Sequence, residues 1–123
     1  MKGDRGGTMI MISPNYEGIG PHPEYPEYMA RDDGDAIVRA CIAGEAIPGD
    51  RLAIAVGNSM SKMRRRRKLV VVGGGVTAEQ MAQCGCKYYP LSALQQAVDD
   101  AVAEYEDCRV AAMSGGADAF LYE

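Results

Sequence analysis

The chain has 123 residues and a mass of 13.2 kDa, and its 13 Lys and Arg against 17 Asp and Glu give a formal net charge of -4. This length supports one domain with its own core, and the acidic balance offers no broad basic face for nucleic acid or an anionic membrane. The apolar runs are much shorter than a membrane span and the first residues lack the apolar region of a secretory signal, so we expect a cytoplasmic protein.

The first part of the chain predicts a strand, a loop and a helix. Thr8–Ser13 is a short apolar run of strand length, which is typical of a buried strand. Four prolines and two glycines in residues 14–28 favour a loop there, rather than a helix or a central strand. Asp35 is a suitable N-cap for a helix over residues 35–44.

The next predicted helix starts after the N-cap Asp50 and runs to about Arg65. Its apolar side chains recur at helical spacing and are expected to form one continuous face: Leu52, Val56, Met60 and Met63. A basic run, residues 64–68, follows at its C-terminus. This run could bind nucleic acid or phosphate, but cations also stabilise a helix C-terminus, and the acidic chain favours that second interpretation.

The middle of the chain predicts a strand, a tight turn and a short helix. Residues 68–72 form a valine-rich run of the kind found in a central strand that is covered on both faces. Glycines at 73–75 then turn the chain, and Thr77 with Gln80 forms a capping box that opens a helix. Lys87–Tyr89 is expected to add a brief strand.

The last part predicts a helix and up to two strands. Ser92 and Gln95 form a second candidate capping box, for a helix whose apolar stripe reaches Tyr105. Residues 109–113 are predicted as a final core strand, and residues 120–122 are expected to add an edge strand.

Together these elements predict a single α/β domain over residues 1–123. We expect a mostly parallel, Rossmann-like sheet of about four strands with helices packed on it. Because ligands of such sheets gather at the carboxyl ends of the strands, the loops there are the candidate site. They carry these residues: Glu17, Gly18, Gly20 and His22 in the first loop, Gly73, Gly74 and Gly75 in the second, and Gly115 and Gly116 in the third.

Residues 73–78 match the pattern G-x-G-x-x-A between a predicted strand and a predicted helix, where glycines let backbone amides approach a phosphate. The acidic residue that a dinucleotide site carries about 20 residues later is missing, since Tyr89 and Pro90 occupy that region. Tight turns need glycines in any case. A stand-alone nucleotide- or phosphate-binding module is therefore the alternative function.

The thiols and the one histidine are the other candidate chemical groups. Cys84 and Cys86 are too close in sequence for the common zinc knuckle, so reduced structural thiols are favoured over a metal or redox site, and Cys41 and Cys108 are expected to be buried. His22 is the only histidine, which excludes a site with several histidines. In its polar loop it is either an acid, base or ligand, or a solvated side chain.

Three glycine-containing motifs and the predicted elements between them follow one another in an order that is found in a known protein family. They are Gly6-Gly7-Thr8-Met9-Ile10-Met11, Glu17-Gly18-Ile19-Gly20 and Arg109-Val110-Ala111-Ala112-Met113-Ser114-Gly115-Gly116, with the helix 50–65, the strand 68–72 and the helix 91–105 between them. Over nearly the whole chain this order resembles the C-terminal domain of the lactate racemase family. Enzymes of that family are much longer two-domain α/β proteins that racemise or epimerise 2-hydroxy acids with a nickel-pincer nucleotide, which takes and returns a hydride at the substrate's C2.

The resemblance implies that this chain is the C-terminal domain of such an enzyme. The tethering lysine, the nickel-binding histidine and the acid/base histidines of the family belong to the N-terminal catalytic domain, so this domain alone is expected to be inactive and to bind no cofactor. Its partners would be that N-terminal domain and a small 2-hydroxy acid. A substrate-facing aromatic residue of the family would fall near Arg51, which suggests a different hydroxy acid. A purely structural interaction domain is a third possibility.

Overall fold

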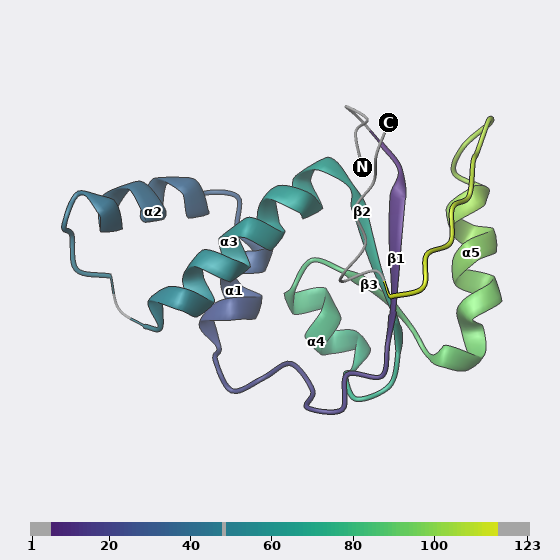
Figure 1. Ribbon diagram of the computed structural model, residues 1–123, viewed down its shortest axis with the longest axis horizontal. Helices are drawn as coiled ribbons and strands as arrows, with labels where there is room; N and C mark the ends of the chain where they lie inside the picture. The colour runs from purple at the N-terminus through teal and green to yellow at the C-terminus, as the bar shows by residue number, and fades with distance from the viewer. Residues whose placement is uncertain (1–5, 48, 116–123) are drawn as a thin grey trace.

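Three parallel strands form the centre of the molecule (Figure 1). The computed structural model describes residues 6–47 and 49–115. The strands β1 (Thr8–Ser13), β2 (Lys68–Gly73) and β3 (Lys87–Tyr89) lie in the order β1-β2-β3, and both pairs are parallel. The predicted α/β class with a parallel sheet and packed helices is confirmed, although the described residues form three strands rather than about four.

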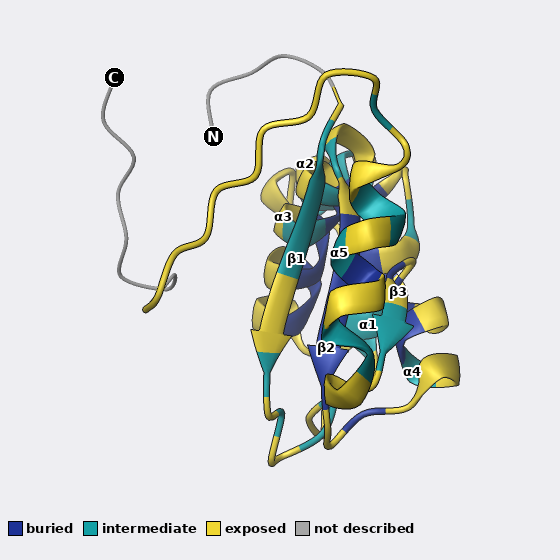
Figure 2. Ribbon diagram, turned by 90° about the vertical axis from the view of Figure 1, so that its right-hand side faces the viewer, coloured by how far each residue is buried: buried dark blue, intermediate teal, exposed yellow. Residues whose placement is uncertain are grey.

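The central strand β2 is covered on both faces, as its valine-rich run predicts. Leu69 and Val71 face a core with Met29 and Met81, while Val70 and Val72 face a second core with Ala97. Successive side chains of a strand point to opposite faces, so one strand can serve both cores. Figure 2 shows helix α5 (Leu94–Val102) on one face of the sheet. Helices α1 (Glu24–Ala30), α3 (Arg51–Arg66) and α4 (Ala78–Gln83) lie on the other.

The edge strand β1 is less buried than its apolar sequence suggests. Met11 and Ile12 are exposed, and β1 pairs only with β2 among the described residues.

Helix α1 (Glu24–Ala30) corrects the prediction of a loop over residues 14–28. Pro26 is the third residue of this helix. The first four N–H groups of a helix have no partner within the helix, so a proline in the first turn removes no hydrogen bond. Proline content alone was therefore a misleading signal here.

Helix α2 (Gly34–Ile42) begins earlier than predicted. Its N-cap position is Asp33, whereas Asp35 lies in the first turn. The Asp35 carboxylate accepts a hydrogen bond from the Asn58 side-chain amide at 3.1 Å and pairs with the Lys62 ammonium at 2.9 Å. Asp35 therefore joins α2 to the next helix instead of capping its own.

Helix α3 (Arg51–Arg66) has the predicted N-cap but not the predicted buried face. The Asp50 carboxylate accepts the backbone N–H of Ala53 at 2.8 Å. The helix buries mainly small residues, namely Ala53, Ile54, Gly57, Asn58 and Ser61, while Leu52, Val56 and Met63 are exposed. A Cβ atom on Gly57 would lie 2.6 Å from the carbonyl oxygen of Tyr25, so this glycine is what lets α1 pack so closely.

Two arginines of the basic run at the end of α3 also stabilise the packing of α1 against α3. Arg64 donates from Nε to the carbonyl oxygen of Met29 at 3.0 Å and from Nη2 to that of Ala30 at 2.9 Å. Arg65 donates from Nη1 to the carbonyl oxygen of Asp32 at 2.8 Å, and the Ser61 hydroxyl donates to the carbonyl oxygen of Arg31. These bonds satisfy carbonyl groups at the C-terminus of α1 that the helix itself leaves without partners.

Helix α4 (Ala78–Gln83) has the predicted capping box. The Thr77 hydroxyl accepts the backbone N–H of Gln80 at 3.2 Å, and the Gln80 side chain accepts the backbone N–H of Thr77 at 2.9 Å. The short strand β3 follows as predicted.

The start and end of α5 differ from the prediction. A 3-10 turn, η1 (Leu91–Ala93), precedes the helix, and Ala93 stands at the N-cap without a side-chain hydrogen bond. Gln95 donates to Asp99 at 2.8 Å instead of closing a capping box with Ser92. The helix ends at Val102, so Tyr105 lies beyond it.

Residues 109–113 do not form the predicted final strand. They are exposed and in no regular structure, and Val110 is 67% exposed. Two of these five residues are alanines, so the segment has little apolar surface to bury. The strand predicted at residues 120–122 lies outside the described residues.

Candidate functional site

The loops that follow β1 and β2 meet at the carboxyl edge of the sheet (Figure 1). A Cβ atom on Gly73 would lie 1.8 Å from the carbonyl oxygen of Ser13, and one on Gly75 would lie 1.8 Å from that of Asn15. Neither position has room for a side chain, and Gly75 also has a φ of +72°, which favours glycine. The glycines of the second loop therefore allow direct backbone packing against the first loop.

The first loop is a tight turn fixed by Asn15. Its backbone carbonyl accepts the N–H of Gly18 at 2.8 Å, and its side-chain amide donates to the carbonyl oxygen of Ser13 at 3.1 Å. Gly18 contacts the second loop, because a Cβ there would lie 3.4 Å from the carbonyl oxygen of Gly75. At the tip of the turn, Tyr16 is 90% exposed and Glu17 is exposed.

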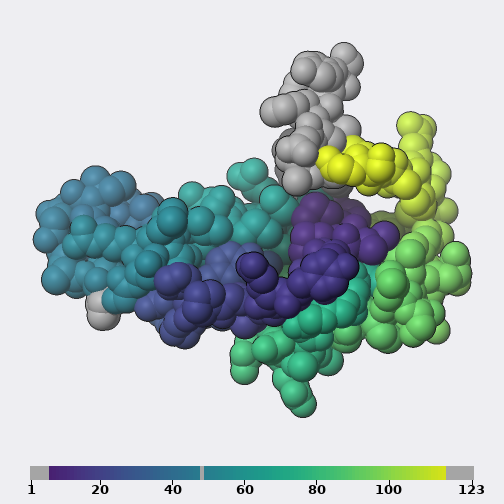
Figure 3. Space-filling view, turned by 60° about the horizontal axis from the view of Figure 1, so that its bottom comes forward, coloured from purple at the N-terminus to yellow at the C-terminus, as the bar shows by residue number. Residues whose placement is uncertain are grey.

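Figure 3 shows the same edge from outside, where the purple surface of the loop after β1 borders the green surface of the loop after β2. The second loop is also held from β3, since the Tyr88 hydroxyl donates to the carbonyl oxygen of Gly73 at 2.8 Å. Gly74, by contrast, has space beside it, with the nearest atom 3.8 Å from an added Cβ.

His22 and Arg51 meet at a second point, the N-terminus of α3. The Nδ1 atom of His22 lies 3.8 Å from a carboxylate oxygen of Asp50, the residue that caps α3 and precedes Arg51. The Glu24 carboxylate accepts the backbone N–H of Asp50 at 3.1 Å. Gly20, with a φ of +86°, lies in the segment that links this group to the first turn.

The surroundings of the glycine turn 73–75 do not resemble a phosphate cradle. The nearest atoms to its glycines are carbonyl oxygens of Ser13, Pro14 and Asn15, which repel an anion. The backbone N–H groups of Thr77 and Gln80 at the start of α4 are already used by the capping box.

The third predicted loop does not join the other two at a strand end. Ser114 and Gly115 follow residues that form no strand, and both are exposed. Gly116 lies outside the described residues. The expectation that three glycine loops would line one edge is therefore wrong for the described part of the chain, where two loops do so.

Two of the thiols, Cys84 and Cys86, are buried. Burial raises the pKa of Cys84 to about 11, with a further contribution from Cys86, whose own pKa is raised by burial. All four cysteines are free; Cys41 is half-buried and Cys108 is exposed, which corrects the expectation that both would be buried. Within residues 6–47 and 49–115, no group of three or more His, Cys, Asp and Glu side chains could hold a metal ion.

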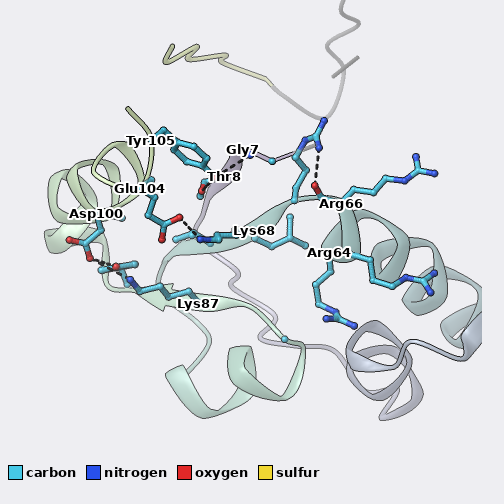
Figure 4. A pocket seen from close by; sticks show the side chains of 18 residues that line it. Gly7, Thr8, Arg64, Arg66, Lys68, Lys87, Asp100, Glu104 and Tyr105 are labelled. Atoms are coloured by element: carbon cyan, nitrogen blue, oxygen red, sulfur yellow. Dashed lines mark hydrogen bonds and ion pairs between the residues drawn. The ribbon is translucent and has the colours of Figure 1, made fainter. Parts of the chain in front are cut away.

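Sequence reasoning missed a cavity of about 430 Å³ at the amino edge of the sheet (Figure 4). Its lining includes the first residue of each strand, Thr8, Lys68 and Lys87, together with the C-terminal part of α5. The available signal was that two of the predicted strands, 68–72 and 87–89, begin with lysine. The sequence alone could not show that these residues face one helix.

Compared with known proteins, the chain matches no protein-family model, no curated protein and no solved structure. In the described part of the chain, no helix is long and apolar enough to cross a membrane. The parallel sheet and the two loops that meet at its carboxyl edge are therefore the features that bear on function.

Proposed function

We propose that this chain is the C-terminal domain of a lactate racemase-like enzyme. It would form one wall of a cleft whose other wall, the N-terminal catalytic domain of the same enzyme, holds a nickel-pincer nucleotide. The observation that supports this proposal best is the backbone packing of Gly73 and Gly75 against Ser13 and Asn15 at the carboxyl edge. Parallel α/β sheets bind ligands at this edge, and closely packed loops make a firm wall for a cleft.

Arg51 is the cationic side chain that we propose for a small anionic substrate. Tyr16 and Glu17 project from the first turn, and His22 and Arg51 lie at the N-terminus of α3. A guanidinium group binds a carboxylate through two parallel hydrogen bonds, so Arg51 is the residue we assign to the carboxylate of a 2-hydroxy acid.

The described residues do not fit the nickel ion of the cofactor. They include no group of three or more metal-binding side chains, and the only histidine, His22, pairs with Asp50. The nickel ligands are therefore proposed to lie in the N-terminal domain. When bound, that cofactor would supply the hydride acceptor.

An exposed apolar stripe on α3 supports a second domain. Leu52, Val56 and Met63 recur on one side of the helix, and Leu52 is 73% exposed. Exposed apolar side chains on one side of a helix are compatible with an interface. The proposed occupant is the N-terminal catalytic domain, which would cover α3 while it approaches Arg51.

Complementation tests the proposal. A lactate racemase N-terminal domain loaded with the nickel-pincer nucleotide is assayed for interconversion of D- and L-2-hydroxy acids, alone and with this chain. We expect no activity from this chain alone and restored activity from the mixture. Gly74→Ala should complement like the wild type, whereas Gly75→Ala should not, because only the second change displaces the first loop.

Calorimetry tests the alternative function, which is nucleotide binding. If the folded chain fails to complement and instead binds ATP or NAD tightly in calorimetry, with binding lost in Gly75→Ala, a stand-alone nucleotide-binding module replaces the proposal. A folded chain that neither complements nor binds nucleotides would support a structural interaction domain.

A further inference from the structure

The cavity at the amino edge of the sheet concentrates positive charge in an acidic chain. Six basic and two acidic residues line it: Arg64, Arg65, Arg66, Arg67, Lys68 and Lys87 against Asp100 and Glu104. The guanidinium groups of Arg64 and Arg65 bond to carbonyl groups at and after the end of α1, so the lysines are the cations on which a site in this cavity would depend. The whole chain has a formal net charge of -4. A local excess of cations in a concave surface raises the concentration of anions there.

Two lysines face the middle of this cavity from neighbouring strands. Lys87 is the register partner of Val70, and Lys68 lies two residues before Val70, so both lysines are on the side of the sheet that α5 covers. Lys68 pairs with Glu104, and the Lys87 ammonium lies 3.4 Å from the Asp100 carboxylate (Figure 4).

Both ion pairs are exposed, so they are weakly held. All four side chains are at least 39% exposed, and exposed ion pairs contribute little net stability. Glu104 raises the pKa of Lys68, while the neighbouring charge of Lys87 opposes that rise. An anion placed between the two ammonium groups would relieve their mutual repulsion and could replace the carboxylates of Asp100 and Glu104.

Beside the two lysines, part of the lining is apolar and aromatic. Val70 and Ala97 form a buried floor, and Tyr89 and Tyr105 lie at its sides. Tyr105 is fixed in place, because its hydroxyl accepts the backbone N–H of Gly7 at 3.1 Å. A volume of about 430 Å³ lies within the usual range for small-molecule sites. This combination suits a ligand with an oxyanion at one end and a flat apolar body at the other.

We propose that this cavity is a binding site for a small organic oxyanion of mononucleotide size. Lys68 and Lys87 bind the phosphate or carboxylate group, and the floor at Val70 and Ala97 receives the apolar body. The site lies at the opposite edge of the sheet from the proposed interdomain cleft, so it is independent of that function.

Titration of the full chain tests the proposal with three probes, namely AMP, benzoate and inorganic phosphate, at low salt. We expect AMP or benzoate to bind in a saturable way and to shift NMR signals of Lys68, Lys87 and Ala97. Tighter binding of AMP assigns a phosphate ligand, and tighter binding of benzoate assigns a carboxylate. Failure of both to bind better than inorganic phosphate would overturn the site.

Charge variants identify the groups that bind. Lys68→Gln with Lys87→Gln should weaken binding about tenfold or more, since charge-assisted hydrogen bonds are lost. Arg39→Gln, an exposed change on α2 outside the cavity, should leave affinity within about twofold, since distant charges are screened. If the double lysine variant and Arg39→Gln lose affinity equally, Lys68 and Lys87 do not bind the anion.

Glu104→Gln is a second variant, for use if the double variant fails to fold. It removes the carboxylate that competes for Lys68, so affinity should rise about threefold or more. Glu45→Gln is the control, because it makes the same charge change at an exposed position outside the cavity. If Glu104→Gln binds no better than Glu45→Gln, Lys68 does not bind the anion.

Discussion

The hydroxyl of Tyr105 accepts a hydrogen bond from the backbone N–H of Gly7 at 3.1 Å, although the two residues are 98 positions apart in the chain. The same hydroxyl lies 3.3 Å from the Thr8 hydroxyl. This contact joins the end of the α5 segment to the start of the edge strand β1.

Tyr105→Phe should therefore destabilise the fold. It keeps the ring and removes the oxygen, leaving the Gly7 N–H without this partner, and the expected loss in the free energy of unfolding is about 1 kcal/mol. Urea denaturation measures it. Tyr16→Phe is the matched control and should change nothing, since Tyr16 is 90% exposed. Equal stability of the two variants would show that the bond to Gly7 contributes nothing.

The two neighbouring glycines of the second loop should respond differently to alanine. Gly75→Ala places a Cβ against the carbonyl of Asn15 at a positive φ, so we expect a loss of about 2 kcal/mol or more in the free energy of unfolding. Gly74→Ala meets only ordinary contacts and should change stability by less than about 1 kcal/mol. Thermal and urea unfolding of both variants give the comparison, and a similar loss in both would refute the backbone packing.

Removal of the N-cap of α3 should cost stability in a graded way. Asp50→Ala removes the acceptor for the Ala53 N–H and should lower the free energy of unfolding by about 1 kcal/mol. Asp50→Asn retains an oxygen that can accept this bond and should recover most of the loss. An asparagine variant as unstable as the alanine variant would show that the charge of Asp50, rather than its cap, is what matters.

The carboxyl group of Asp35 should titrate at unusually low pH. Hydrogen bonds from Lys62 and then Asn58 lower the pKa of Asp35 from 3.8 to about 2. Its contribution to stability is therefore present above pH 3.8 and is lost as the pH falls toward about 2. NMR titration of the Asp35 carboxyl carbon measures the pKa, which should rise toward 3.8 in Lys62→Gln; an unchanged midpoint would exclude Lys62 as the cause.

The cysteines should differ in their reaction with iodoacetamide near neutral pH. Cys108 is exposed and should be modified first. Cys84 and Cys86 are buried, and their raised pKa values keep them as thiols, so they should react only after unfolding. Mass spectrometry of the native and denatured chain locates the adducts, and rapid native labelling of Cys84 would contradict its burial.

The sequence predicted best what neighbouring residues determine. The continuous apolar run of β2 and the Thr77–Gln80 capping box are local patterns with one physical meaning, and both formed as expected. The parallel sheet then correctly located two glycine loops at one edge, because all parallel strands end on the same side.

What the sequence did not reveal depends on contacts between distant segments. Small residues form the buried face of α3 because α1 approaches it at Gly57. Helix α1 was not predicted, because Pro26 favoured a loop. The cavity at Lys68 and Lys87 exists only because two strand starts face α5.

The close approach at Gly57 joins α1 directly to α3. Arg64 and Ser61 of α3 hold the carbonyl groups at the end of α1, and the first loop enters α1 directly after His22. A second domain that pressed on Leu52 and Val56 would therefore move α1 with α3, and this movement would reach the turn at Asn15 through the chain itself. The surface that would receive a partner and the loop that would face its ligand are thus mechanically connected.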